Sequence, residues 1–328
     1  SFWKDKKVMV TGGAGLIGSA LSANLIKCGS KVTIVDNFER GKFDYIVDIM
    51  DDCIVKNADL REARFCDLHI KDYDIVIHMA SKVGGIGYYT SRPYEVMSEN
   101  LKMDSNVLSA CVKNKIPMFF YASSAHVYPK ELQGTPDSPL IREEQAEPAN
   151  PELSYGWAKL ITEKQIEAAV QQSTSFKAAI ARYIGIYGKN QDFKLDTGSV
   201  IPVFCNRAIS HPNVEFNVWG NGKETRSYCF IEDAIEGTKA MIEAMDSKNM
   251  VGPYNLGKQE RVSIGEIAEK VIAISDKNII INFDTSKETL IWGQWCDCSK
   301  IKNDLGWEAT TSLEEGLKVV YEDVKSRI

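Results

Sequence analysis

Residues 8–18 read Val-Met-Val-Thr-Gly-Gly-Ala-Gly-Leu-Ile-Gly, and this stretch decides the fold. It opens with a short apolar run that is typical of a buried strand, and the segment Leu16–Lys27 that follows has a helical pattern. Glycines spaced in this way between a strand and a helix make a tight turn, let a pyrophosphate reach the backbone N–H groups, and allow the helix to pack on the sheet. We therefore expect a dinucleotide to bind through Gly12, Gly15, Leu16, Ile17 and Gly18.

An acidic residue closes the second apolar run. Asp36 follows the strand-like segment 31–35, near the ~20-residue offset at which dinucleotide-binding folds place the acid that binds ribose. A carboxylate there accepts hydrogen bonds from the ribose hydroxyls and repels a 2′-phosphate, so we expect NAD rather than NADP. Asp59 and Leu60 come just after a third predicted strand, where we expect contact with the adenine.

Strand-like and helical patterns alternate through the first half of the chain. Further strands are expected at 75–78, 118–122 and 178–183, and longer helices at 96–114 and 155–171. This alternation predicts a parallel sheet that is covered on both faces, and right-handed crossovers make it a doubly wound α/β fold.

The pattern becomes less regular after Tyr187-Gly188. A strand and turn are expected at 217–222, and a strand followed by a helix at 228–245. Further helices are expected at 265–274 and 312–325. We expect a Rossmann NAD-binding domain made of residues 1–185 plus about 226–256, and a smaller C-terminal α/β substrate domain made of about 186–225 and 257–328.

Composition excludes several classes of protein. The 328 residues are 44% hydrophobic and 26% charged, which is ordinary for a globular protein, and the net charge of −6 favours neither nucleic acid nor a membrane surface as a partner. The eight cysteines form no paired C-x-x-C framework, so we expect reduced thiols and no metal site. With no signal peptide and no apolar run of about 20 residues, a cytoplasmic protein is expected.

Prolines crowd one segment of the chain, at positions 129, 136, 139, 148 and 151. Together with the charged run Arg142-Glu143-Glu144 they predict a long, solvated surface loop. Because this loop lies between a strand end and a helix start, we expect it at the rim of a pocket.

Tyr155 and Lys159 are four residues apart on a predicted helix and so share one face. An ammonium beside a phenol favours the phenolate and lowers the phenol pKa from its usual ~10. Lys159 can also hold the nicotinamide ribose. Alone, this spacing is more often a structural helix pair. Together with the glycine loop and with Ser123-Ser124 at a strand end, it predicts that Tyr155 acts as a base on a substrate hydroxyl.

The chain resembles the extended short-chain dehydrogenase/reductase family over nearly its whole length. The motifs are residues 11–18, 78–80, 100, 121–124, Tyr155 with Lys159, and 182–188, and residues 219–222 and 225–228 match the NAD-dependent nucleotide-sugar epimerases and dehydratases within that family. The resemblance implies a Rossmann domain, tightly held NAD with Ala80 and Lys159 among its contacts, and a nucleotide-sugar substrate. It also implies a homodimer built on residues 100–111 and 155–171, and a sugar hydroxyl bracketed by Ser124 and Tyr155.

Within this family the chain looks most like the GDP-mannose 3,5-epimerases. The likeness rests on residues 82–87, Lys-Val-Gly-Gly-Ile-Gly, and on residues 119–129. It implies that Lys82, Gly84 and Gly85 contact the substrate.

Four positions depart from that subgroup. His126 stands where the subgroup has a cysteine that acts as an acid or base, and Ser199 where it has a lysine, although Lys194 is near. Residues 292–294, Trp-Gly-Gln, replace an Arg-x-Arg that grips the diphosphate, and Gly185 replaces an asparagine. What takes over from the Arg-x-Arg is left open by the sequence.

His126 has two interpretations. A histidine titrates near neutrality, so it can exchange a proton next to a transient C4 ketone and permit inversion at C3 or C5. The alternative is that His126 only hydrogen-bonds the substrate or packs under the rim. For the phosphates we expect Arg226 to make a bidentate contact, with Lys223 or Arg207 as alternatives.

These observations predict NAD-dependent epimerisation of a nucleotide-diphosphate sugar through a transient 4-keto intermediate, either as in the 3,5-epimerases or as a simple 4-epimerisation. A 4,6-dehydratase, decarboxylase or 4-reductase of the same family is one alternative, although Ala125-His126 replaces the acidic pair of the dehydratases. A non-catalytic NAD-binding scaffold is another, and the presence of both Tyr155 and Lys159 argues against it. The nucleotide, the sugar and the inverted carbon stay open.

Overall fold

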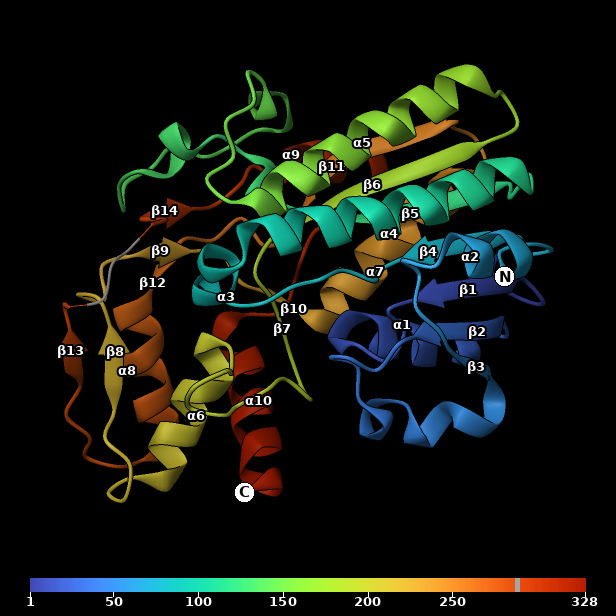
Figure 1. Ribbon diagram of the computed structural model, residues 1–328. Coiled ribbons are helices and arrows are strands. Elements are labelled where there is room, and N and C mark those ends of the chain that lie inside the picture. Colours follow the sequence, from blue (N-terminus) through green and yellow to red (C-terminus); the bar gives the residue numbers. More distant parts are fainter. Residues whose placement is uncertain (287–289) are drawn as a thin grey trace.

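A seven-stranded sheet forms the centre of the molecule, in the order β3-β2-β1-β4-β5-β6-β11 (Figure 1). The computed structural model describes residues 1–286 and 290–328. Every neighbouring pair of strands in this sheet is parallel. The strands are β1 (Lys7–Thr11), β2 (Lys31–Asp36), β3 (Ile54–Asn57), β4 (Ile75–His78), β5 (Met118–Ser124), β6 (Lys177–Tyr183) and β11 (Met250–Leu256). The strand order reverses between β1 and β4, which confirms the predicted doubly wound α/β fold.

Helices cover both faces of this sheet (Figure 1). One face packs against α1 (Leu16–Lys27), α7 (Ile231–Ala244) and α9 (Ser299–Leu305), and the other against α2 (Ala63–His69), α4 (Pro93–Lys113) and α5 (Ser154–Gln172). Helix α4 begins at Pro93, before the predicted residue 96, because a proline is well tolerated in the first turn of a helix. In the described part of the chain, no helix combines the length and the apolarity that a membrane crossing requires.

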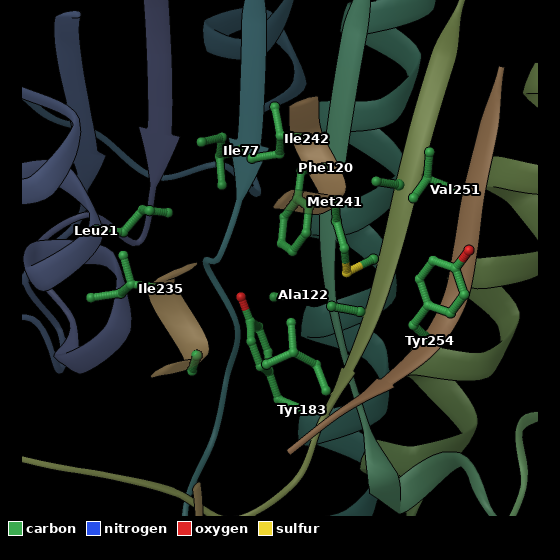
Figure 2. Close-up of a cluster of buried hydrophobic side chains, with 14 of the residues drawn as sticks. Leu21, Ile77, Phe120, Ala122, Tyr183, Ile235, Met241, Ile242, Val251 and Tyr254 are labelled. Carbon is green, nitrogen blue, oxygen red and sulfur yellow. The ribbon is translucent and has the colours of Figure 1, made fainter. Parts of the chain in front are cut away.

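One hydrophobic core lies between the sheet and helices α1 and α7. Figure 2 shows side chains from both layers meeting there, with Leu21 and Ile235 from the helices facing Ile77 and Phe120 from the strands. Phe120 and Ile77 are fully buried. The sheet residues of this core alternate with residues that face α4 and α5, as strands covered on both sides require.

A second core gathers at the end of the molecule where α6 (Val200–Ser210), α8 (Ile264–Ser275) and α10 (Leu313–Arg327) lie together (Figure 1). The parallel pair β8 (Asn217–Trp219) and β13 (Asn282–Asp284) packs beside it. Short strands complete this half: β7 (Ile186–Tyr187), β9 (Thr225–Arg226), β10 (Cys229–Phe230), β12 (Val262–Ser263) and β14 (Gly293–Gln294). The division of the chain into two domains at the residues given above stays a prediction.

Two helices of this second core begin with the same local signal. Ser263 caps α8 by accepting the backbone N–H of Glu266, and Glu266 reaches back to the N–H of Ser263. Ser312 and Glu315 form the same reciprocal pair at the start of α10. Each pair satisfies two backbone N–H groups that have no partner inside the helix, so the sequence Ser-x-x-Glu fixes where these helices begin.

The proline-rich segment is a series of short 3-10 turns: η3 (Ala125–Val127), η4 (Lys130–Gln133) and η5 (Glu143–Ala146). The prediction of a solvated loop is wrong for Glu143, which is 6% exposed and accepts the backbone N–H of Asn255 at 2.9 Å. Gln133 and Ile141 are buried as well. The segment packs against β11, where the backbone N–H of Asn255 donates to the Glu143 carboxylate. A run of charged residues in the sequence does not reveal such a distant hydrogen-bond donor.

Truncation of the first core gives a test of this packing. Phe120→Ala removes a fully buried ring, so the free energy of unfolding is expected to fall by about 3–5 kcal/mol in denaturant titrations. Ile280→Ala is the control, because Ile280 is 80% exposed and its truncation is expected to change the free energy of unfolding by less than about 0.5 kcal/mol. Equal losses in the two variants would contradict the placement of Phe120.

Candidate active site

The glycine loop between β1 and α1 packs directly against the end of β4. Gly12 has a φ of +65°, and a Cβ atom there would lie 2.7 Å from the Cα and N atoms of Ala80. A Cβ atom at Gly18 would lie 2.2 Å from the carbonyl oxygen of Gly12. Residues 15–17 start α1 without a side-chain cap, so the first N–H groups of the helix are left for another acceptor. This cradle without side chains fits the diphosphate of a dinucleotide.

Asp36 lies at the end of β2, beside this loop. Its carboxylate accepts the backbone N–H of Ala14 at 3.0 Å and that of Phe38 at 2.9 Å. The side chain is therefore fixed next to the cradle, where its charge opposes a 2′-phosphate.

The two residues expected at the adenine follow β3. The carboxylate of Asp59 is bound by Arg61, whose Nε lies 2.9 and 3.0 Å from its two oxygens, and this hydrogen bond lowers the pKa of Asp59. Leu60 is 4% exposed and packs in a core with Met9 and Val35. Contact of Asp59 or Leu60 with an adenine stays a prediction.

Ser124, His126 and Tyr155 come together where β5 ends. The rings of His126 and Tyr155 lie edge to face with centroids 5.7 Å apart, and Oγ of Ser124 accepts the backbone N–H of His126 at 3.2 Å. Ser124 also hydrogen-bonds the Tyr155 hydroxyl. Gly156 makes the approach of α5 possible, because a Cβ atom there would lie 2.0 Å from the carbonyl oxygen of His126. The three residues predicted to act on the sugar therefore share one site.

Lys159 lies one turn further along α5 and is 1% exposed. Its Nζ is 4.6 Å from the ring centroid of Tyr121 and 5.7 Å from that of Tyr155. Burial lowers the pKa of Lys159, while the charges of Asp104 and Glu163 raise it. The ammonium thus lies on the same side of the helix as Tyr155, as the spacing of four predicts.

The pKa of Tyr155 departs from the direction that the sequence predicts. Burial raises the pKa of Tyr155 to about 12, a hydrogen bond with Ser81 lowers it, the charge of Asp104 raises it, and a hydrogen bond with Ser124 lowers it. The expectation of a lowered pKa is wrong for this arrangement, because withdrawal of the phenolate from water outweighs the groups that favour it.

Arg226, on β9, places a positive charge near His126. Burial first, and then this charge, lower the pKa of His126 to about 4, so the imidazole is neutral near pH 7. The guanidinium of Arg226 donates to the carbonyl oxygens of Thr225 and Ile291, each at 2.8 Å. Among the described residues it forms no ion pair; burial lowers its pKa, while the charges of Tyr228 and Glu224 raise it. A half-buried guanidinium that is not ion-paired suits an anion.

The other cations considered for the phosphates lie differently. Lys223 and Lys194 are exposed, as is Ser199. Arg207 is buried and donates to the backbone carbonyl of Asn217. Arg226 is therefore the cation among them that is placed with His126.

Lys82 forms ion pairs with carboxylates of the loop after β2 and of α4. Its ammonium pairs with Glu39 and lies 3.2 Å from Glu99 and 3.8 Å from Glu95. Three carboxylates therefore compensate its charge on the side of the glycine loop. A contact of Lys82 with the substrate stays a prediction.

A second contact joins the same two segments, the loop after β2 and the segment after β4. Arg40 donates to the carbonyl oxygen of Val83, next to Lys82. These two contacts join the loop after β2 to the segment after β4, across the glycine loop of β1 that lies between them. Gly84 packs against the ring of Tyr88, and Gly85 precedes the short helix α3 (Ile86–Ser91).

Sequence reasoning missed two residues that contact Tyr155. Tyr89 of α3 is 5% exposed, and its ring stacks on that of Tyr155 with centroids 5.0 Å apart and lies 6.1 Å from His126. Ser81 hydrogen-bonds the Tyr155 hydroxyl and donates to Oδ1 of Asn100 at 2.8 Å. Its place directly after Ala80, at the carboxyl end of β4, is the signal that could have identified Ser81. No comparable signal marks Tyr89.

All eight cysteines are free thiols. Burial raises the pKa of both Cys296 and Cys298, to about 12 for Cys298, which disfavours the thiolate that binds metals. Among residues 1–286 and 290–328 we find no group of three or more histidine, cysteine or acidic residues placed to hold a metal ion.

The NAD-dependent epimerase/dehydratase family matches residues 8–257 of this chain. The matched span runs from β1 to the end of β11 and contains the glycine loop, Ser124, His126, Tyr155 and Arg226.

Two curated relatives match almost the whole chain. GDP-mannose 3,5-epimerase of Arabidopsis thaliana is 30% identical over 100% of this chain and 85% of its own length. A UDP-N-acetyl-alpha-D-glucosaminuronate decarboxylase of Bacillus cytotoxicus is 29% identical over 95% of this chain and 96% of its own length. Among solved structures, UDP-N-acetylglucosamine 4-epimerase from Methanobrevibacter ruminantium, in complex with UDP-N-acetylmuramic acid, superposes with a TM-score of 0.86 at 23% identity, covering 99% of this chain and 100% of that chain.

The glycine cradle gives a direct prediction for cofactor binding. Gly18→Ala places a Cβ atom 2.2 Å from the Gly12 carbonyl oxygen, which pushes α1 away from the loop, so the affinity for NAD is expected to fall at least about tenfold in calorimetric titration. Gly134→Ala is the matched control, because nothing lies within 4 Å of a Cβ atom at Gly134. Unchanged NAD affinity in Gly18→Ala would show that the loop does not hold the dinucleotide.

Proposed function

The chain belongs to the NAD-dependent epimerase/dehydratase family and is thus an enzyme with NAD as its cofactor, and we propose that it epimerises a nucleotide-diphosphate sugar through a transient 4-keto intermediate. The observation that carries this proposal is the grouping of Ser124, Tyr155 and Lys159 at the carboxyl end of the sheet. Ligands of open α/β sheets bind at this edge, where the strand order reverses.

Tyr155 takes the proton of the sugar C4 hydroxyl, and Ser124 orients that hydroxyl by a hydrogen bond. The ammonium of Lys159 is the positive group on the same face of α5, and it favours the phenolate against the effect of burial. NAD held by the cradle of Gly12, Gly15 and Gly18 would supply a reversible hydride acceptor, so no cofactor would be consumed overall. Return of the Tyr155 proton to the sugar oxygen completes the cycle.

His126 and Tyr89 are the residues we propose for inversion next to the ketone. The neutral imidazole of His126 is free to accept a proton from C3 or C5 near pH 7. Tyr89 lies 6.1 Å away, ring to ring, and burial raises its pKa, so it keeps a proton that it can donate to the opposite side of the enolate. Likeness to GDP-mannose 3,5-epimerase supports this version, and a simple 4-epimerase would need neither residue.

Arg226 is the residue we propose for the diphosphate. Its guanidinium is half-buried near His126 and forms no ion pair among the described residues, so a bound diphosphate would add a counter-charge. Neutralisation of Arg226 by a bound diphosphate would also raise the pKa of His126, because the charge of Arg226 is one cause of its low value. Substrate binding would therefore make His126 a stronger base.

A decarboxylase is the second candidate function, and likeness to the Bacillus cytotoxicus enzyme favours it. A 4,6-dehydratase would need an acid and a base beside C5 and C6, where this chain has Ala125 and His126. A 4-reductase would consume NADPH, which Asp36 disfavours. A non-catalytic scaffold would have no use for the tyrosine and lysine on α5.

We also propose that the protein forms a homodimer through α4 and α5 and that it works in the cytoplasm. These two helices pack side by side on one face of the sheet (Figure 1), and the resemblance described above supports their use as an interface. Light scattering of the purified protein tests the dimer.

The proposed function predicts a specific pattern of isotope exchange. Incubation with a panel of nucleotide-diphosphate sugars in D2O, followed by NMR, is expected to show an inverted product, with deuterium at C3 or C5 for enolisation and without deuterium for simple C4 inversion. Tyr155→Phe removes the base and is expected to slow either reaction by about 10²–10⁴-fold. Wild-type rates in Tyr155→Phe would exclude this mechanism, and a decarboxylated product would favour the second candidate.

A second prediction separates His126 and Tyr89 from Tyr155. In His126→Asn and in Tyr89→Phe, deuterium incorporation at C3 or C5 is expected to fall by about 10²–10⁴-fold, while the absorbance of reduced cofactor after mixing with substrate still appears. Tyr88→Phe is the control, because Tyr88 is a neighbour on α3 that is not in contact with His126 among the ring contacts described. Undiminished exchange in both variants would remove the two residues from the mechanism.

A further inference from the structure

A buried carboxylate lies behind the active site. Asp104 is on α4, has no exposed surface, and receives hydrogen bonds from three other elements. The donors are Nε2 of His78 at 2.9 Å, the hydroxyl of Tyr121 at 2.5 Å and Oγ1 of Thr162 at 3.0 Å. These partners come from β4, β5 and α5, so Asp104 is held at the junction of the strands and helices that carry the site.

Groups that can donate to a carboxylate surround Asp104. Oγ1 of Thr11 accepts the backbone N–H of Ala80 at 3.3 Å and lies 2.6 Å from Nδ1 of His78. With its proton on Nε2, His78 donates to Asp104 at 2.9 Å. Burial alone would raise the pKa of Asp104, but the Lys159 ammonium and the His78 hydrogen bond outweigh it and hold the pKa below its usual value.

Lys159 is the cation that faces this carboxylate. Both groups contact Tyr121, whose hydroxyl binds Asp104 while the ammonium lies 4.6 Å from its ring centroid. Besides Asp104, one other carboxylate acts on Lys159, that of Glu163. Glu163 is already paired with Arg182, at 2.6 and 3.0 Å. Asp104 is therefore the carboxylate whose charge is left to balance the buried ammonium.

We infer that Asp104 is the fixed counter-charge of Lys159, a positioning residue that keeps the ammonium charged beside Tyr155. A buried ammonium tends to lose its proton because water no longer solvates it, and a nearby fixed negative charge opposes that loss. This inference rests on the proposed function, in which the ammonium must be charged to favour the Tyr155 phenolate.

The charge of Asp104 also disfavours the Tyr155 phenolate, because it raises the pKa of that phenol. Removal of the charge at Asp104 should lower the pKa of Lys159 and also that of Tyr155. Activity needs the phenolate, which is lost as pH falls, and the ammonium, which is lost as pH rises. Both limbs of the pH profile should therefore move to lower pH together.

Other charged or titratable groups face this pair, and none replaces Asp104. Those packed against Tyr155 and Lys159 are Tyr89 from α3, Tyr121 from β5, His126 from η3 and Glu163 from α5, with Arg226 of β9 acting on His126. Burial raises the pKa of Tyr89 and of Tyr121, and His126 has a pKa of about 4, so these three are neutral near pH 7.

Asp104→Asn tests the inference, because it removes the charge and keeps the shape. Both limbs of the pH profile of sugar turnover are expected to move down by about one pH unit or more. Thr162→Val is the matched control: it removes one donor to the same carboxylate, at 3.0 Å, and leaves the charge, so its profile is expected to stay in place. A lower profile without displacement in Asp104→Asn would indicate a merely structural role and overturn the inference.

A second measurement needs no substrate. In protein labelled with 13C at the lysine ε carbons, the Lys159 signal, assigned through Lys159→Arg, is expected to show an ammonium at pH 7.5. In Asp104→Asn the same signal is expected to titrate at lower pH than in the wild type. A neutral Lys159 at pH 7.5 in the wild type, or an unchanged titration in the variant, would overturn the inference. Absence of turnover with every sugar tested would count against the proposed function and leave this titration to decide on Asp104.

Discussion

The close packing of Gly12 against Ala80 is the contact on which the active site depends. A side chain at Gly12 would meet the backbone at the end of β4, so this glycine lets β1 and β4 run side by side up to the point where the strand order reverses. The start of α1 and the end of β5 lie at this same edge of the sheet, where open α/β sheets bind their ligands. The polar groups of the site, from Asp36 to Tyr155, lie at this carboxyl edge of the sheet.

Burial dominates the electrostatics of this site. It raises the pKa of Tyr155 and lowers the pKa of Lys159, His126 and Arg226. Charged ligands and a few fixed charges can therefore change the protonation state of each of these groups. Because little water screens the charges in a buried site, each charge shifts the pKa of its neighbours more than it would in water.

Much of the fold and part of the site could be predicted from the sequence. Alternation of strands and helices, the glycine loop and the Tyr155/Lys159 spacing are local signals, and they led to the correct sheet and to the side chains that meet at the end of β5. What the sequence did not reveal was non-local. The ion pairs of Lys82 depend on carboxylates from two other segments, and the burial of Glu143, where a solvated loop was predicted, depends on a backbone N–H in β11.

The same reason explains the residues that were missed. Asp104 looks like any acidic residue on a helix, because its partners His78 and Thr162 are 26 and 58 positions away. Tyr89 of α3 stacks on Tyr155 of α5, 66 positions further along the chain, and burial raises the pKa of Tyr155. Local periodicity carries no information on such pairings.

Two contacts connect the segments on either side of the glycine loop, one from Arg40 to Val83 and one from Lys82 to Glu39. They join the two segments that flank the cradle, the loop after β2 and the segment after β4. Contacts of this kind oppose the separation of the two sides of the site expected for the dinucleotide. An enzyme that regenerates its cofactor at each turnover gains from slow exchange, because the same nucleotide then serves many successive sugar molecules.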